Sequence, residues 1–322
     1  MVMQRREQWS GVFPATLVPF TDDPRYSVDE AGFRSYLRQF VGVPGITGVV
    51  VNGHTGEIQA LFPEERALVT SIAADELGDH LPVISGVSAE ASLEAIQHAQ
   101  QAQQAGARAI LLMPPHLWLR FGRDSDTAIR FVRDVAATID IGVIVHQYPA
   151  WTKVSYTTEE LVELARIFNV VAIKDGTREL ARYERNVRTL RQMAPNVSIL
   201  TCHDEYLLPT LIQGVDGALI GFAGFVPELM AELVAAALRD DLPRARRLYE
   251  RVYILKQAVY RMGEPSQDAH QRMKMAMYLR GKISSPRVRP PLAPLSDAVV
   301  AEIRRELEKV GMLRQEAIGA RG

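Results

Sequence analysis

The sequence has one cysteine, few aromatic residues, no excess of charge of either sign and no long apolar run. The single cysteine, Cys202, excludes an internal disulfide and a multi-cysteine metal cluster, which suits a reducing compartment, so we expect a cytoplasmic protein. The 37 Lys and Arg residues nearly balance the 38 Asp and Glu residues, which gives no summed field to attract nucleic acid or an anionic membrane. No segment approaches the ~18 apolar residues of a membrane span, and no apolar stretch follows the charged N-terminus. We therefore expect no signal peptide, no membrane anchor and a small-molecule partner.

What the sequence does have is a repeated alternation of short apolar runs with longer amphipathic segments. Such alternation is typical of βα units around a parallel sheet, and 322 residues suffice for one barrel plus an appendage. The predicted fold is a (β/α)8 barrel, in the α/β class, with a C-terminal helical extension. The eight predicted strands are 12–18, 48–51, 82–85, 109–113, 142–146, 170–174, 198–201 and 217–221.

From about Pro227 onward the strand signals stop and only helical patterns follow. We expect helices at 229–238, 243–260, 269–279 and 297–310. The chain then divides into an N-terminal arm (1–10), a barrel (11–238) and a helical appendage with a tail (239–322). The basic loop 280–294, with Arg287 and Arg289, is interpreted as solvated surface and not as a nucleic-acid site.

Reactive groups of such barrels lie where the strands end, at the C-terminal face. Four of the seven histidines follow predicted strands in this way. The candidates at these ends are His54, Thr55, His116, His146, Tyr148, Lys174, Asp175, His203 and Asp204, with Leu219 in the last strand.

Lys174 closes the apolar run of strand 170–174. An apolar environment disfavours the ammonium and lowers the pKa of a lysine, which leaves a neutral amine able to attack a carbonyl. Such an amine condenses with a 2-oxo acid to an iminium, an electron sink for carbon–carbon bond cleavage or loss of water. The alternative is a lysine whose stem packs at the rim while its head pairs with Asp175.

The segment 52–57 places two glycines around His54 and Thr55, just past a strand. Turns of this kind let backbone N–H groups converge on an anion such as a carboxylate. A plain tight turn is the alternative.

Together these segments resemble the dihydrodipicolinate synthase and N-acetylneuraminate lyase superfamily of class I aldolases. The resemblance spans about residues 11–300 and rests on 11–20, 53–57 leading to 63–66, 82–86, 105–107, 170–175 and 214–221. It implies a homo-oligomer, a dimer or a tetramer built as a dimer of dimers, with no cofactor and no metal. It also implies that Lys174 forms the Schiff base with pyruvate or another 2-oxo acid.

Three departures from the family pattern concern proton transfer. Family members carry a threonine and two tyrosines, one from a neighbouring subunit, where this chain has His54, His116 and His146. Imidazoles suit the task because their pKa lies near neutral. Tyr148 has the same strand parity as His146, so either residue is a candidate for the main acid/base.

A further departure concerns the substrate. Trp151 stands where members that use an aspartate-semialdehyde partner carry an arginine, so a second carboxylate would lose its bidentate partner. We expect a substrate site formed by His54, Thr55, Trp151, His203 and Leu219. Aromatic residues near the rim (Trp118, Tyr148, Trp151, Phe222, Phe225) suggest an apolar or aromatic distal group, although loop packing explains them equally well.

The predicted function is a Schiff-base lyase acting on a 2-oxo acid, as an aldolase, hydratase-aldolase or dehydratase, and not the lysine-biosynthesis synthase. Two alternatives remain open. His54, His116 and His146 could hold a zinc ion for hydrolysis or hydration. Alternatively, a barrel that has lost the proton relay of the family, which consists of a threonine and two tyrosines, would bind ligands without turning them over.

Overall fold

The computed structural model describes residues 8–261 and 268–313. Residues 1–7 of the expected N-terminal arm, and 314–322 of the expected tail, lie outside the described residues. Within the described residues, no helix is long and apolar enough to cross a membrane.

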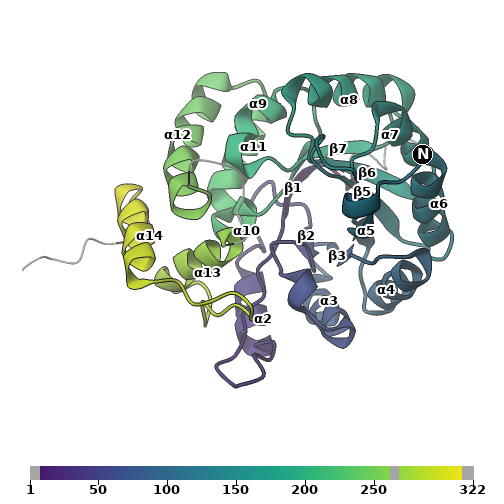
Figure 1. The fold of residues 1–322 in the computed structure, drawn as a ribbon. Coiled ribbons are helices and arrows are strands. Elements are labelled where there is room, and N and C mark those ends of the chain that lie inside the picture. Colours follow the sequence, from purple (N-terminus) through teal and green to yellow (C-terminus); the bar gives the residue numbers. More distant parts are fainter. Residues whose placement is uncertain (1–7, 262–267, 314–322) are drawn as a thin grey trace, which may run out of the picture.

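Eight parallel strands form the centre of the molecule (Figure 1). They hydrogen-bond in the order β1-β8-β7-β6-β5-β4-β3-β2, and parallel bridges from Val12 to Ile46 and from Ala15 to Val50 join the two ends of this order. The predicted (β/α)8 barrel is therefore confirmed. The strands are β1 (Gly11–Pro14), β2 (Val49–Val51), β3 (Val83–Val87), β4 (Ala109–Leu112), β5 (Gly142–Gln147), β6 (Val170–Asp175), β7 (Ser198–Thr201) and β8 (Gly217–Ile220).

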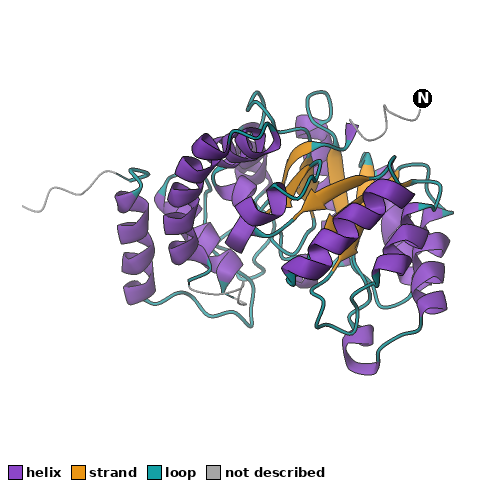
Figure 2. Cartoon of the chain, turned by 90° about the horizontal axis from the view of Figure 1, so that it is seen from above, coloured by secondary structure: helices purple, strands orange, loops and turns teal. Residues whose placement is uncertain are grey.

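Helices surround the strands, as Figures 1 and 2 show. Local signals set their starts: the Thr157 hydroxyl accepts from the Glu160 N–H, and the Glu160 carboxylate accepts from the Thr157 N–H. The barrel helices are α2 (Glu30–Arg38), α3 (Pro63–Leu77), α4 (Ser92–Gln104), α5 (Leu117–Phe121), α6 (Ser125–Ala136), α7 (Thr158–Ala165), α8 (Leu180–Met193), α9 (Leu207–Leu211), α10 (Phe222–Phe225) and α11 (Pro227–Leu238), with 3-10 turns η1 (Ile58–Ala60) and η2 (Asp204–Tyr206).

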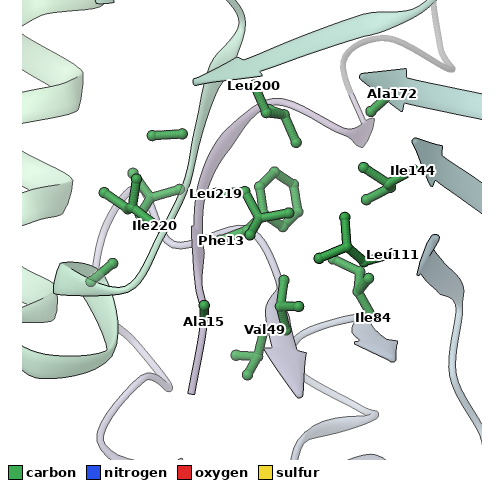
Figure 3. Close-up of a cluster of buried hydrophobic side chains, with 14 of the residues drawn as sticks. Phe13, Ala15, Val49, Ile84, Leu111, Ile144, Ala172, Leu200, Leu219 and Ile220 are labelled. Carbon is green, nitrogen blue, oxygen red and sulfur yellow. The ribbon is translucent and has the colours of Figure 1, made fainter. Parts of the chain in front are cut away.

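The barrel interior is filled by apolar side chains, and this packing fixes which residues reach the mouth. Ile144 of β5, Ala172 of β6 and Leu200 of β7 point into this core (Figure 3). Side chains two positions further along a strand lie on the same side. His146 and Lys174, which are register partners on β5 and β6, therefore form the next layer at the C-terminal end of the barrel.

The C-terminal extension consists of α12 (Leu242–Val259), α13 (Ala269–Leu279) and α14 (Asp297–Lys309). Buried charges tie it to the barrel: Lys274, fully buried, pairs with Glu57, and Arg289 pairs with Glu65 through two 2.5 Å contacts. The interpretation of loop 280–294 as solvated surface is wrong for Arg289, which is 8% exposed. Arg287 is exposed, as that interpretation requires, and pairs with Asp22.

Candidate active site

A cavity of about 610 Å³ opens where the strands end, at the barrel face expected to carry the chemistry. Lys174 of β6, the turn after β2 and residues of the C-terminal extension all contribute to its wall. The lining residues used below are His54, Thr55, Gln59, His146, Tyr148, Lys174, Arg178, Asp204, Leu219, Tyr260, His270 and Arg289.

Lys174 lines this cavity, and desolvation by burial lowers the pKa of its amine. Among the described residues, none forms a hydrogen bond or ion pair with its Nζ within the usual limits. The alternative in which the head of Lys174 pairs with Asp175 is wrong. The Asp175 carboxylate lies on the other side of the strand, where it accepts from the Thr177 N–H at 2.8 Å and from Asn186 at 3.0 Å.

The turn after β2 carries His54 and Thr55 into the cavity. Asn52 and Glu57, at either end of the turn, have φ values of 54° and 55°, a conformation that costs free energy in a non-glycine residue. The surrounding structure holds both in place. The Asn52 amide donates to the Arg66 carbonyl at 2.8 Å, and Glu57 pairs with Lys274. Strained backbone that is held so firmly is common at functional sites.

Tyr148 connects two of the predicted histidines. Its hydroxyl lies 2.8 Å from Nε2 of His54 and 3.2 Å from Nε2 of His116. Burial raises the pKa of Tyr148, and burial together with the charge of Lys174 lowers the pKa of His54 to about 3. The Tyr148 phenol and the His54 imidazole are therefore both neutral near pH 7. The Tyr148 hydroxyl can donate a hydrogen bond to one of its two histidine partners while it accepts one from the other.

His146 is buried beside this group, with its ring centroid 4.8 Å from that of Tyr148. Burial and the charge of Lys174 hold the pKa of His146 well below its usual range. Its Nδ1 has no hydrogen-bond partner in the described part of the chain. No group of three His, Cys, Asp or Glu side chains in residues 8–261 and 268–313 is placed to hold a metal ion. The Tyr148 hydroxyl hydrogen-bonds to both His54 and His116. The zinc-site alternative therefore lacks its geometry.

Two predicted substrate contacts do not reach the cavity. His203 is fully buried, with its Nε2 2.6 Å from the Thr177 carbonyl and its Nδ1 2.9 Å from the Thr201 hydroxyl. Trp151 is 63% exposed and is not part of the lining. The prediction that His203 and Trp151 contact the substrate is therefore wrong within a single chain. Thr55 and Leu219 do line the cavity, and their contact with the substrate stays a prediction.

The suggested aromatic distal pocket has little support in this geometry. Of the five aromatic residues expected near the rim, only Tyr148 lines the cavity. Trp118 packs edge-on against Phe131, and Phe222 and Phe225 are fully buried against each other. Ordinary packing accounts for these three.

Sequence reasoning missed Arg178, Tyr260 and His270, which also line the cavity. Tyr260 donates to the buried carboxylate of Asp204 at 2.9 Å, and Asp204 also accepts from the backbone N–H groups of Gly221 and Phe222. Burial raises the pKa of Asp204 to about 6. Tyr260 and His270 follow or begin helices of the extension, so no strand-end pattern could have indicated them.

Fold and site together define a class: a (β/α)8 barrel whose buried lysine lines a cavity with neutral imidazole and phenol side chains at the mouth of the barrel. The comparison with protein families gives the particular family. The model of the dihydrodipicolinate synthetase family matches residues 8–310, and the chain belongs to this family. The protein is accordingly a lyase of the class I aldolase type.

Relatives match the chain over nearly its full length. A 4-hydroxy-tetrahydrodipicolinate synthase of Methanothrix thermoacetophila is 32% identical, over 94% of this chain and 97% of that protein. The putative 2-dehydro-3-deoxy-D-gluconate aldolase YagE of Escherichia coli K12 is 26% identical, over 96% of this chain and 99% of that protein. A crystal structure of YagE in complex with pyruvate superimposes with a TM-score of 0.86, covering 95% of this chain and 99% of that chain.

Proposed function

We propose that the protein is a Schiff-base lyase in which Lys174 condenses with pyruvate or another 2-oxo acid. The observation that carries the proposal is the position of Lys174, which is desolvated, has no described partner for its amine and lines a cavity beside His54 and His146. A neutral amine is the form that attacks a carbonyl. The pyruvate complex of YagE, a relative at 26% identity, agrees with this choice of substrate.

The chemistry follows in balanced steps. The Lys174 amine adds to C2 of the 2-oxo acid, and loss of water gives an iminium. Loss of a proton from C3 gives an enamine, whose C3 forms a bond to the carbonyl carbon of an aldehyde while the new alkoxide takes up a proton. Water then hydrolyses the iminium and releases Lys174. Aldol cleavage is the reverse sequence, and an enamine with a hydroxyl on C4 can instead lose it as water.

We assign the main acid/base to Tyr148, in series with His54 and His116, rather than to His146. Tyr148 hydrogen-bonds to two imidazoles at 2.8 and 3.2 Å, whereas no hydrogen bond from His146 to a described residue supports a relay through it. A proton leaving C3 needs a connected series of groups that both donate and accept. His54, Tyr148 and His116 form such a series.

We also propose that this lyase is not the lysine-biosynthesis synthase and that it acts as a homo-oligomer. The first part is supported by Trp151 at the position of the family arginine. The second is supported by four exposed apolar side chains, Leu117, Leu119 and Phe121 of α5 and Trp151 of the loop after β5. The Lys153 ammonium joins their two segments by donating to the Arg120 carbonyl at 2.9 Å. We call these four residues the mouth patch. A second copy of the chain would bury it.

Borohydride trapping tests the proposal. Treatment with sodium borohydride and pyruvate should add the mass of the reduced adduct, and peptide mapping should place it on Lys174. Lys174→Ala should abolish labelling, whereas Lys309→Ala, which removes a half-exposed lysine of α14, should not. Lack of labelling across a broad set of 2-oxo acids would contradict the proposal, and ligand-induced stabilisation without turnover would then favour a barrel that only binds.

A further inference from the structure

We propose that the part of the substrate beyond the 2-oxo acid is uncharged and hydroxylated, and that His270 of the C-terminal extension hydrogen-bonds to it. This inference rests on the proposed function and specifies which substrates the same cavity accepts. A cavity of about 610 Å³ is far larger than a three-carbon 2-oxo acid requires. The remaining space must therefore receive the aldehyde, or the distal part of a longer substrate.

Arg289 is one of two guanidinium groups on the described cavity wall, and its donors are already engaged. Nε donates to the Tyr26 carbonyl at 3.1 Å, and one terminal nitrogen donates to the same carbonyl at 2.7 Å. The other terminal nitrogen donates to the Ala60 carbonyl at 2.7 Å, and both contact the Glu65 carboxylate at 2.5 Å. A guanidinium has five N–H donors, and these contacts account for all five. A substrate anion would have to displace Glu65.

Arg178 is the second guanidinium, and it is also neutralised. Its Nε lies 2.7 Å from the carboxylate of Glu205, and a terminal nitrogen donates to the Gly176 carbonyl at 3.0 Å. Both members of the ion pair are largely buried, with exposed fractions of 13% and 5%. Separating such a pair leaves a buried charge without its partner, which is costly.

The charges around the reacting carbon already cancel, so no positive charge remains to bind a second anionic group of the substrate. In the bound state the iminium on Lys174 carries one positive charge, and the substrate's own carboxylate carries one negative charge. Asp204, whose buried carboxylate interacts with the charge of Lys174, adds a second negative charge when it is ionised. A distal carboxylate or phosphate would add another in a site of low dielectric, where repulsion is strong.

His270 supplies the polar contact. It is the second residue of α13 and lines the same cavity as His54 and Lys174. Burial lowers the pKa of His270 to about 4, so the imidazole is neutral near pH 7. No hydrogen bond joins its ring to any residue of 8–261 or 268–313 within the usual limits. A neutral imidazole has one donor and one acceptor, which matches a hydroxyl group.

The rest of the cavity wall suits a short hydroxylated carbon chain. Ala60, Pro290, Pro291 and Leu292 supply apolar surface, and Gln59 supplies an amide. A substrate without hydroxyls would leave the His270 imidazole without a hydrogen-bond partner, which weakens binding. The site should therefore favour hydroxylated substrates over those that lack hydroxyls.

Matched aldehydes with pyruvate as the common partner test the inference. Glyceraldehyde and glyceraldehyde 3-phosphate differ by an anionic group, as do butanal and succinic semialdehyde, whereas propanal and glyceraldehyde differ by hydroxyls. We expect kcat/KM for each uncharged aldehyde to exceed that of its anionic counterpart at least about tenfold, and glyceraldehyde to exceed propanal by about tenfold, the value of one net hydrogen bond.

Variants of His270 test its role. His270→Leu should lower kcat/KM for glyceraldehyde about tenfold more than kcat/KM for propanal, which removes the preference between the two aldehydes. His270→Asn should restore part of the preference, because it returns a donor and an acceptor. His80→Ala, which changes an exposed histidine in the turn after α3, is the matched control and should leave the preference intact.

Three outcomes would overturn the inference. They are turnover of the anionic aldehydes as fast as their uncharged counterparts, an equal effect of His270→Leu on glyceraldehyde and propanal, and a trapped pyruvate adduct that reacts with no aldehyde of the set. Failure to trap any adduct is a different result, because it would contradict the proposed function itself.

Discussion

The Tyr148 hydroxyl lies 2.8 Å from Nε2 of His54, although the two residues are 94 positions apart in the chain. On its other side the same hydroxyl is 3.2 Å from His116, whose Nδ1 is 3.8 Å from the carboxylate of Glu90. His116 and Glu90 are partly exposed, with side-chain fractions of 33% and 52%. Hydrogen bonds within one chain therefore connect His54, on the cavity wall, with a partly exposed imidazole, which is the route that the proposed relay would use.

Tyr148→Phe should lower kcat by about 10²–10⁴-fold, the usual contribution of a positioned acid/base. The substitution removes one oxygen and leaves the ring packing against His146 unchanged. Pyruvate trapping on Lys174 should persist, because the amine remains desolvated. Steady-state kinetics together with borohydride labelling separate the two effects.

The matched control is Tyr278→Phe, which removes a hydroxyl from a half-exposed tyrosine of the extension and should leave kcat unchanged. His146→Gln provides the comparison that decides between the two candidates. If His146→Gln were as damaging as expected for Tyr148→Phe, and Tyr148→Phe were nearly silent, the relay would have to run through His146.

The sequence predicted the barrel and the position of Lys174 at its mouth, because strand periodicity and strand ends are local signals. It could not choose between His146 and Tyr148. His146 lies within β5, but Tyr148 comes after the last strand residue, Gln147, where the direction of a side chain depends on the loop. The same limit applies to His203, which follows β7 and turns into the protein interior.

Other residues could not be predicted because their positions depend on packing between distant segments. Arg289 belongs to a loop whose basic and proline-rich composition indicates solvent exposure. Its guanidinium nevertheless lies 4.5 Å from the Phe20 ring and pairs with Glu65, 224 positions away. His270 comes to the cavity only because the extension packs onto the barrel mouth.

Glu57→Gln should lower the free energy of unfolding by about 3–5 kcal/mol, the usual cost of removing one member of a buried ion pair. Its partner Lys274 is fully buried, lies 4.1 Å from the Phe20 ring and donates to the Arg287 carbonyl at 2.9 Å. Without the Glu57 carboxylate this ammonium loses its counter-charge. Denaturant unfolding measures the loss.

The double variant Glu57→Gln, Lys274→Met is the control, since it removes both charges at once. It should be more stable than Glu57→Gln alone, because no unpaired ammonium remains. A loss below about 1 kcal/mol in the single variant would show that the pair does not hold the turn between β2 and η1.

Trp151→Glu combined with Phe121→Glu should convert the proposed homo-oligomer to single chains, as measured by sedimentation velocity. The two side chains are 63% and 70% exposed and belong to the mouth patch, so two carboxylates there would oppose its burial. The proposed relay of His54, Tyr148 and His116 lies within one chain, so kcat should fall by less than about tenfold. Tyr253→Glu on α12 is the control. Dissociation with complete loss of activity would mean that a second chain completes the site.

His203→Asn should reduce the pH dependence of stability. Burial and the nearby Arg178 charge lower the pKa of His203 to about 3 in the folded protein, whereas an unfolded histidine titrates near about 6.5. As the pH falls below the unfolded value, only the unfolded chain takes up this proton, and the free energy of unfolding therefore decreases. Between about pH 7.5 and about pH 5.5 this one group accounts for a loss of about 1.4 kcal/mol.

Denaturant unfolding of both proteins at these two pH values checks the prediction. The difference between the two pH values should be smaller in His203→Asn by about 1.4 kcal/mol. The variant's loss of stability at the higher pH reports instead the hydrogen bonds to Thr177 and Thr201. Asp204, whose raised pKa of about 6 acts in the opposite direction, is present in both proteins and cancels from the comparison. An unchanged difference would mean that the folded protein protonates His203 at mildly acidic pH.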